Sequence, residues 1–228
     1  MSVNVVRDID KVVKIRRVLL SVSDKTGLDS FVPALLEINP GIHFYSTGGT
    51  FGYIQKLLGE KKSADHLTQV SDYTGQPETQ GGLVKTLDFK IYLGLLTETY
   101  NEHHQGDLKR TGALQLDMVV VNLYPFRETV SRAGVTVEEA RSNIDIGGPC
   151  MVRASAKNYL RVASVTDPAD YAPIVSTLKK SGGMMTLADR FELAKKAFAH
   201  TAAYDTAIAK FLATAAIADV EKCYTFKG

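Results

Sequence analysis

The chain has 228 residues, of which 45% are hydrophobic and 23% charged, a composition typical of a folded globular protein rather than a disordered one. Its 27 Lys and Arg against 25 Asp and Glu give a net charge of +2, which provides no electrostatic reason to expect nucleic acid or an anionic membrane as the main partner. The two cysteines, Cys150 and Cys223, have no metal-ligand spacing and indicate a reduced, cytoplasmic compartment. The apolar run 18–20 is too short for a signal sequence or a membrane span, so secreted, membrane and fibrous classes are excluded.

Short apolar runs alternate with helical patterns over the first ~165 residues. Strands are predicted at residues 18–22, 42–46, 91–95, 118–123 and 162–165. Between the first two, residues 28–36 carry apolar side chains at helical spacing. The run 118–121 does not alternate with polar residues, as expected for a strand covered on both faces. This order predicts an α/β fold, a mostly parallel sheet with helices on both faces.

The last part of the chain has a different pattern. Residues 179–183, Lys-Lys-Ser-Gly-Gly, predict a break. From Thr186 to Ala218 the chain is rich in Ala, Leu and Lys without Gly or Pro, which predicts one long helix or two abutting helices. We therefore expect a main domain over residues 15–180 and a helical extension over residues 184–222 packed on it. Residues 1–14 are expected to be a flexible start.

Two hydroxyl-rich segments follow the first two predicted strands. They are Ser-Val-Ser-Asp-Lys-Thr-Gly at 21–27 and Ser-Thr-Gly-Gly-Thr at 46–50. Ligands of such folds bind beyond the carboxyl ends of the strands, and each segment offers hydroxyls and backbone N–H groups at a helix start, with Lys25 as a cation. One such loop is more often only a helix cap, but two after neighbouring strands favour an anion site. Neither loop has Walker or dinucleotide-binding spacing.

Two further segments carry groups suited to chemistry. Lys85 stands in a glycine-rich stretch, residues 75–86, where a plain surface lysine is the alternative. At residues 143–149 a Gly-Gly-Pro sequence predicts a helix start with exposed N–H groups, with Asp145 just before it and Lys157 further along the helix. A carboxylate, a lysine and a bare helix start suit proton transfer and oxyanion stabilisation. The alternative is a capping aspartate and a solvated lysine.

Six motifs occur in one order: Ser-Val-Ser-Asp-Lys-Thr-Gly at 21–27, Ser-Thr-Gly-Gly-Thr at 46–50, Val-Lys-Thr-Leu at 84–87, Asn-Leu-Tyr-Pro-Phe at 122–126, Ile-Asp-Ile-Gly-Gly-Pro at 144–149 and Ala-Lys-Asn at 156–158. In these motifs the chain resembles the inosine monophosphate (IMP) cyclohydrolase domain, normally the N-terminal half of a bifunctional purine-biosynthesis enzyme whose other half is a formyltransferase. The resemblance runs from about Arg17 to Tyr204 and includes His-Thr-Ala-Ala-Tyr-Asp at 200–205. We expect a stand-alone cyclohydrolase or an excised domain.

The resemblance implies a methylglyoxal-synthase-like, three-layer α/β/α fold with a mostly parallel sheet and a C-terminal helical extension. It implies the dehydrative closure of 5-formamidoimidazole-4-carboxamide ribotide to IMP, without cofactor or metal. It also implies a cytoplasmic homodimer, and it leaves open whether a separate formyltransferase chain binds to deliver the substrate.

Site residues follow from the resemblance position by position. The implied catalytic group is Lys85, Tyr124, Asp145 and Lys157. The implied substrate-binding residues are Ser23, Lys25, Thr47, Gly48, Gly49, Thr50, Thr86, Asn122, Ile146, Gly147 and Gly148. In the mechanism expected for this group, Asp145 is paired with Lys157 and accepts the amide proton, while helix-start N–H groups and Lys85 polarise the formyl oxygen.

The sequence departs from the family at two places. Leu83 replaces the usual arginine, and Asp88-Phe89 replaces a His-Pro pair, so altered substrate affinity is expected. A non-catalytic nucleotide sensor is therefore the main alternative, since related domains bind allosteric ligands. Methylglyoxal synthase fits the motifs at 122–126 and 144–149 less well, and a structural protein would not need ligand-type loops after four strands.

Overall fold

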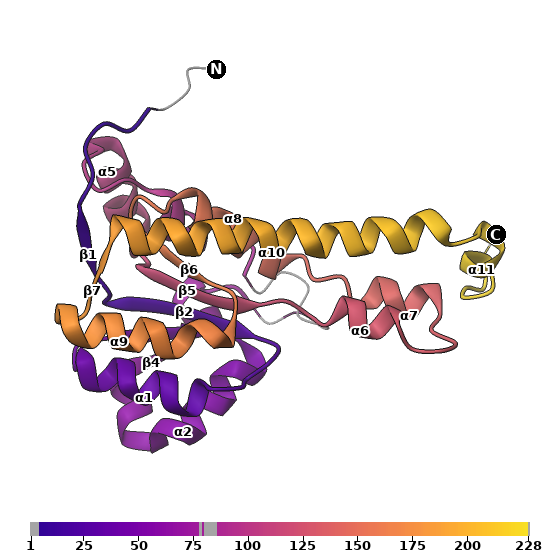
Figure 1. The fold of residues 1–228 in the computed structure, drawn as a ribbon, viewed down its shortest axis with the longest axis horizontal. Helices are drawn as coiled ribbons and strands as arrows, with labels where there is room; N and C mark the ends of the chain where they lie inside the picture. The colour runs from indigo at the N-terminus through magenta and orange to yellow at the C-terminus, as the bar shows by residue number, and fades with distance from the viewer. Residues whose placement is uncertain (1–4, 78, 80–85, 228) are drawn as a thin grey trace.

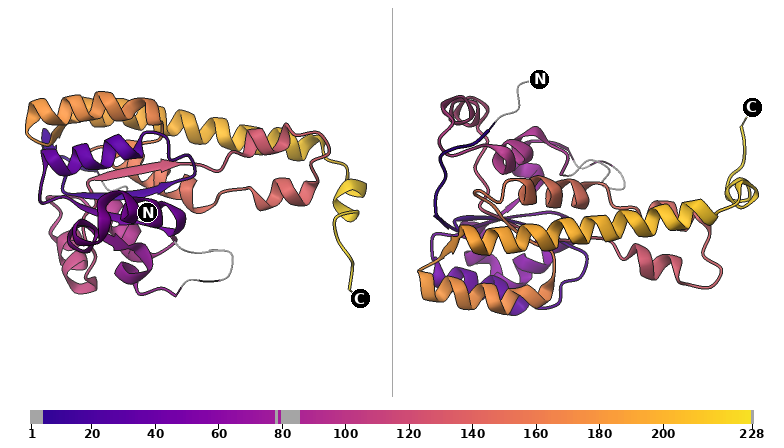
Figure 2. Two further views of the ribbon diagram at one scale, coloured as in Figure 1. Left: turned by 90° about the horizontal axis from the view of Figure 1, so that it is seen from below. Right: turned by 45° about the horizontal axis from the view of Figure 1, so that its top comes forward.

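The central feature is a parallel sheet of five strands that lies between two layers of helices (Figures 1 and 2). The computed structural model describes residues 5–77, 79 and 86–227. The strand order is β4-β3-β2-β5-β6, and each of these pairings is parallel. The strands are β1 Val12–Lys14, β2 Arg17–Val22, β3 His43–Ser46, β4 Leu67–Gln69, β5 Met118–Asn122, β6 Ala163–Val165 and β7 Met184–Thr186. The predicted three-layer α/β/α fold is confirmed.

Helices connect the strands and extend beyond them. They are α1 Leu28–Ile38, α2 Gly48–His66, α3 Val70–Thr74, α4 Phe89–Leu96, α5 Glu102–Thr111, α6 Phe126–Val130, α7 Val137–Ser142, α8 Gly147–Lys157, the 3₁₀ helix η2 Pro168–Asp170, α9 Tyr171–Ser181, α10 Leu187–Thr214 and α11 Ile217–Glu221. In the described part of the chain, none of them combines the length and the apolar character that a membrane crossing requires.

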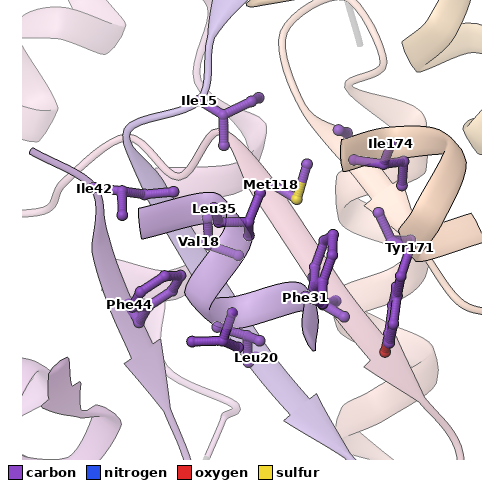
Figure 3. Close-up of a cluster of buried hydrophobic side chains, with 14 of the residues drawn as sticks. Ile15, Val18, Leu20, Phe31, Leu35, Ile42, Phe44, Met118, Tyr171 and Ile174 are labelled. Carbon is purple, nitrogen blue, oxygen red and sulfur yellow. The ribbon is translucent and has the colours of Figure 1, made fainter. Parts of the chain in front are cut away.

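Two hydrophobic cores lie on the two faces of the sheet, because successive residues of a strand point to opposite sides. From β2, Val18 and Leu20 enter the core beneath α1 and α9, whereas Leu19 enters the core beneath α4 and α8. In the first core the rings of Phe31 and Tyr171 stack at 4.3 Å between centroids (Figure 3). Burial on both faces explains why the strands are apolar without alternation.

Residues 91–95, predicted as a strand, lie in helix α4, so that prediction is wrong. Ile91, Gly94 and Leu95 are buried at helical spacing, and the Asp88 side chain caps the helix by accepting the N–H of Lys90 at 2.7 Å. A five-residue apolar run fits either element, and only the packing of α4 on the sheet decides between them.

The N-terminal segment is more ordered than expected. Its residues Val12–Lys14 form β1, which pairs antiparallel with β7 beside the main sheet. The prediction of a flexible start over residues 1–14 is therefore wrong for this strand. The strands β1 and β7 and the edge strand β4 were not predicted. Each has three residues and ends in a polar one, whereas the three-residue strand β6 lies in the apolar run at 162–165.

The predicted C-terminal helices are present as α10 and α11. The first half of α10 packs on α8 and β6, and its second half runs beyond the sheet beside α6 and α7, with α11 at its far end (Figure 1). A capping box formed by Thr186 and Asp189 starts α10. The break predicted at 179–183 coincides with the end of α9, where Gly182 adopts a left-handed φ of 67°.

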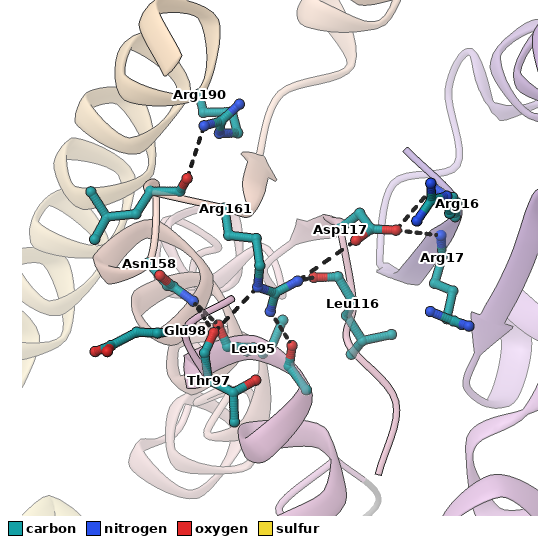
Figure 4. Close-up of polar contacts among 12 residues, drawn as sticks. Arg16, Arg17, Leu95, Thr97, Glu98, Leu116, Asp117, Asn158, Arg161 and Arg190 are labelled. Carbon is teal, nitrogen blue, oxygen red and sulfur yellow. Dashed lines mark hydrogen bonds and ion pairs between the residues drawn. The ribbon is translucent and has the colours of Figure 1, made fainter. Parts of the chain in front are cut away.

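A buried arginine joins the central strands to α4. The Arg161 guanidinium donates to the carbonyl oxygens of Gly94, Thr97 and Leu116 and lies 3.6 Å from Asp117 (Figure 4). The Asp117 carboxylate in turn accepts the N–H groups of Arg17, the first residue of β2, and of Arg16 before it. The network therefore fixes the starts of β2 and β5 relative to each other.

A second arginine, Arg190 on α10, is fully buried at 0% exposure. Its guanidinium donates to the carbonyl oxygens of Asp10, Tyr159, Leu160 and Met185 at 2.6–3.0 Å. It therefore ties the start of α10 to the N-terminal segment, to β7 and to the chain entering β6.

Replacing Arg190 with methionine is expected to lower the free energy of unfolding by about 3 kcal/mol or more, because several buried carbonyl groups lose their donor at once. Urea denaturation measures the loss. The matched control is Arg110→Met on α5, which should change stability far less, because the Arg110 side chain is mostly exposed and pairs with the exposed Asp107. Similar unfolding midpoints for the two variants would show that the Arg190 contacts contribute little.

Candidate active site

A cavity of about 310 Å³ opens at the carboxyl ends of β2, β3 and β5. Such a position is the usual ligand site of an open α/β sheet. The lining residues are Ser21, Val22, Ser23, Lys25, Thr47, Gly48, Gly49, Thr50, Thr86, Leu87, Asn122, Tyr124, Asp145, Gly147, Gly148 and Met151. Most of the site residues predicted from the sequence are therefore brought together around one cavity.

The two hydroxyl-rich loops form one wall and are bonded to each other. The hydroxyls of Ser21 and Thr47 are 2.9 Å apart, and the Thr50 hydroxyl bonds both the N–H and the carbonyl of Val22. Among the residues that the structure describes, no side chain caps the start of α2, so its first N–H groups at Gly48 and Gly49 are available beside the cavity. Hydroxyls, helix-start N–H groups and the Lys25 ammonium suit a phosphate group.

Asn122 lines the cavity, but its amide is used to hold the first loop. Its side-chain oxygen accepts the N–H groups of Ser23 and Asp24 at 2.7 and 2.9 Å, and its side-chain nitrogen donates to the Asp24 carbonyl at 2.8 Å. The observed role of Asn122 is thus to shape the loop that carries Ser23 and Lys25. Direct contact of Asn122 with a substrate stays a prediction.

The opposite wall carries Asp145 at the start of α8. The Asp145 carboxylate accepts the Gly148 N–H at 2.9 Å, and burial raises the pKa of this carboxyl. Both glycines of α8 are required by space: a Cβ on Gly147 would lie 2.4 Å from the Thr86 hydroxyl, and one on Gly148 would lie 2.5 Å from Asp145 Oδ2. The site therefore holds a partly buried carboxylate with a raised proton affinity, close to a helix N-terminus.

Four predicted residues need separate mention. Tyr124 is 51% exposed at the rim of the cavity, and Ile146, 58% exposed, does not line it. Lys157 is the last residue of the 11-residue helix α8, about 15 Å along its axis from Gly147, and it is exposed. In this structure the predicted pair of Asp145 and Lys157 is not formed. Lys85 lies outside the described residues.

Of the two departures from the family, Asp88-Phe89 is described and Leu83 is not. Asp88 is buried, caps α4 and accepts the Gln76 side-chain amide at 2.8 Å, while Phe89 is exposed. Asp88 therefore has a structural role at the start of α4. Neither residue lines the cavity.

Sequence reasoning missed some contributors. Ser21, Val22, Leu87 and Met151 line the cavity without having been assigned to it. Ser21 and Val22 lie in the motif at 21–27, so their position at the carboxyl end of β2 was a usable signal. The side chain of Met151 enters because it lies one turn after Gly147 on α8, a signal visible only once the start of α8 is known.

A second cavity, of about 570 Å³, adjoins the first and shares Ser23, Asn122 and Tyr124 with it. Its other walls come from α6, from the loop after β6 and from α10, which contributes His200 and Tyr204. In the described ranges, 5–77, 79 and 86–227, no three His, Cys, Asp or Glu side chains are grouped so that they could hold a metal ion.

Comparisons with known proteins identify the family of the chain. The MGS-like domain model matches residues 27–150, and the AICARFT/IMPCHase bienzyme model matches residues 155–227. The bifunctional purine biosynthesis protein PurH of Magnetococcus marinus is 49% identical to this chain, and the match covers 87% of this chain and 36% of PurH. The PurH of Bacillus subtilis is 48% identical, and the match covers 87% of this chain and 37% of that protein.

The chain thus spans little more than a third of these curated relatives. A solved structure titled "Crystal structure of ForH" superposes with a TM-score of 0.75 at 29% identity, over 87% of this chain and 97% of that one. The family model, the relatives and the solved structure all support one assignment: the chain belongs to the family of MGS-like domains.

Proposed function

We propose that this chain is an IMP cyclohydrolase, which closes 5-formamidoimidazole-4-carboxamide ribotide to IMP with loss of water. One observation carries the proposal: two hydroxyl-rich loops suited to a phosphate and a partly buried carboxylate face each other across a single cavity. Relatives named as bifunctional purine biosynthesis proteins support the same reaction class.

In this proposal the ribotide phosphate lies against the N-terminus of α2 and the loop that follows β2. Thr47 and Thr50 supply hydroxyls, Gly48 and Gly49 supply N–H groups, and Lys25 supplies positive charge. The imidazole ring of the substrate then points toward the start of α8, because that wall lies across the same cavity. Thr86 and the Gly147 backbone border this end.

The reaction itself joins two neighbouring substituents of one imidazole ring, so proximity is already present in the substrate. The carboxamide nitrogen attacks the formyl carbon, and the Asp145 carboxylate accepts the proton that this nitrogen loses. The formyl oxygen becomes a hydroxyl and then leaves as water, while the former formamide nitrogen loses its proton and forms the new double bond. The raised pKa of Asp145 makes its carboxylate a better base than an exposed aspartate.

Two other groups complete the proposal. Tyr124, which lines the same cavity as Asp145, is proposed to help expel water through its hydroxyl. Lys85 is proposed to polarise the formyl oxygen, although it lies outside the described residues. Lys157 receives no role in the closure, because it stands at the far end of α8.

The proposal is tested with the purified chain and the formamido ribotide, following ultraviolet absorbance as the purine ring forms. We expect turnover without added metal or cofactor. Tight binding of the ribotide without turnover would instead identify a nucleotide sensor, the alternative favoured by the residues at 83 and 88–89. Absence of both binding and turnover would contradict both functions.

The proposal extends to the setting of the reaction. The formamido ribotide is expected to come from a formyltransferase, since the relatives are named as bifunctional and the bienzyme model matches residues 155–227. We further propose a cytoplasmic homodimer. Light scattering of the chain alone, and then with a formyltransferase, tests both associations.

A further inference from the structure

Tyr204 of α10 reaches across to the turn that carries Asp145. Its side chain is 7% exposed, and its hydroxyl accepts the Asp145 N–H at 2.9 Å. The same hydroxyl donates to the Asn143 carbonyl at 3.2 Å. One hydroxyl therefore binds both ends of a three-residue turn that lies 59 or more positions away in sequence.

The turn has little other support from secondary structure. Helix α7 ends at Ser142 and α8 begins at Gly147, so Asp145 belongs to neither. Its carboxylate is held from the cavity side by the Gly148 N–H, and its backbone is held from the other side by Tyr204. The Tyr124 backbone N–H also interacts with this carboxylate. The carboxylate is thus oriented by two backbone groups, and the Asp145 backbone by the Tyr204 hydroxyl.

The Tyr204 ring is itself held in place. Phe126 packs edge-on against it at 6.1 Å between ring centroids. Arg190 ties down the start of α10, the helix that carries Tyr204. Burial raises the pKa of the Tyr204 phenol, so the hydroxyl keeps its proton for the Asn143 carbonyl near neutral pH. Tyr204 does not line the first cavity, and its hydrogen bonds to the turn at 143–145 connect it to the site.

We propose that Tyr204 is the positioning residue for the Asp145 carboxylate, through which helix α10 sets the geometry of the catalytic turn. This inference rests on the proposed cyclohydrolase function. A catalytic group displaced by about 1 Å can lose about a hundredfold in rate, whereas the phosphate-binding wall is built from other elements. Loss of the hydroxyl should therefore lower kcat and leave ribotide binding nearly unchanged.

The test compares Tyr204→Phe with a matched control, Tyr73→Phe. The Tyr73 hydroxyl also accepts a backbone N–H, that of Leu114 at 2.7 Å, but Tyr73 does not line the cavity. Both variants keep the ring and lose one such acceptor, and Tyr204→Phe also loses the donor to the Asn143 carbonyl, so its melting temperature should fall somewhat further than that of Tyr73→Phe. We expect only Tyr204→Phe to lower kcat, by about tenfold or more, with KM for the ribotide and Kd for IMP within about twofold.

The outcomes separate the two claims. Normal kcat in Tyr204→Phe beside an active wild type overturns the positioning role alone, and so does an equal loss of kcat in Tyr73→Phe. A wild type without turnover overturns the proposed function and this inference together. Retained binding of IMP by Tyr204→Phe shows that the variant is folded, so that a loss of kcat is assigned to the turn.

Discussion

Replacing Asp145 with asparagine is expected to lower kcat by about 10²- to 10⁴-fold, the usual contribution of a general acid–base residue. Asparagine has nearly the same shape, and its amide oxygen can still accept the Gly148 N–H, so the turn and the cavity should be kept. Binding of the ribotide should change little, because the phosphate lies against the opposite wall. Steady-state kinetics by ultraviolet absorbance and titration with IMP measure the two effects separately.

The matched control is Asp189→Asn, which also removes a carboxylate that accepts a backbone N–H at a helix start, here the N–H of Thr186 at 2.9 Å. This variant is expected to lose some stability and no kcat, because Asp189 caps α10 away from the cavity. If Asp145→Asn kept kcat within tenfold of the wild type, Asp145 would not be the base.

The dependence of kcat on pH is a second test of the Asp145 carboxylate as the base. The base is the ionised carboxylate, and burial raises its pKa, so activity should be present above this pKa and lost as the pH falls through it. We expect the acid limb of the wild-type kcat profile to lie above the pKa of an ordinary aspartate. The residual activity of Asp145→Asn should lack that limb.

The sequence predicted the position of the cavity well, because its evidence was local. Apolar runs marked β2, β3, β5 and β6, and the carboxyl ends of parallel strands lie on one edge of a sheet. Segments that follow those strands had to approach one another, whatever the details of the helices. The motifs at 21–27 and 46–50 therefore reached the same cavity as expected.

What the sequence could not give was distance along and between helices. Asp145 and Lys157 were expected to pair, but α8 lies between them, and its rise places Lys157 about 15 Å along the axis from Gly147. Conversely, Tyr204 lies 59 residues from Asp145, and only the packing of α10 against the turn brings its hydroxyl to the Asp145 N–H. Residues 91–95 failed for a related reason, since their short apolar run fits a strand or a helix until its packing partner is known.

Replacing Gly148 with alanine should damage the same carboxylate by crowding it. The added Cβ would lie 2.5 Å from Asp145 Oδ2 and 2.7 Å from Leu123 Cδ2, so both side chains must move. Gly148 does not have a positive φ, so any loss comes from this contact rather than from the backbone conformation. We expect kcat to fall about a hundredfold and stability to fall by about 1–3 kcal/mol, measured by turnover and by urea denaturation.

Gly106→Ala on α5 is the matched control for that substitution, because a Cβ there meets nothing within 4 Å. In a helix interior the change from glycine to alanine should raise stability by about 0.5–1 kcal/mol and leave kcat unchanged. A Gly148→Ala enzyme with normal kcat would show that the Asp145 carboxylate can move by several tenths of an ångström without loss. Asp145 would then not need the close placement that the Gly148 N–H and the Tyr204 hydroxyl give it, and its role as the base would be in doubt.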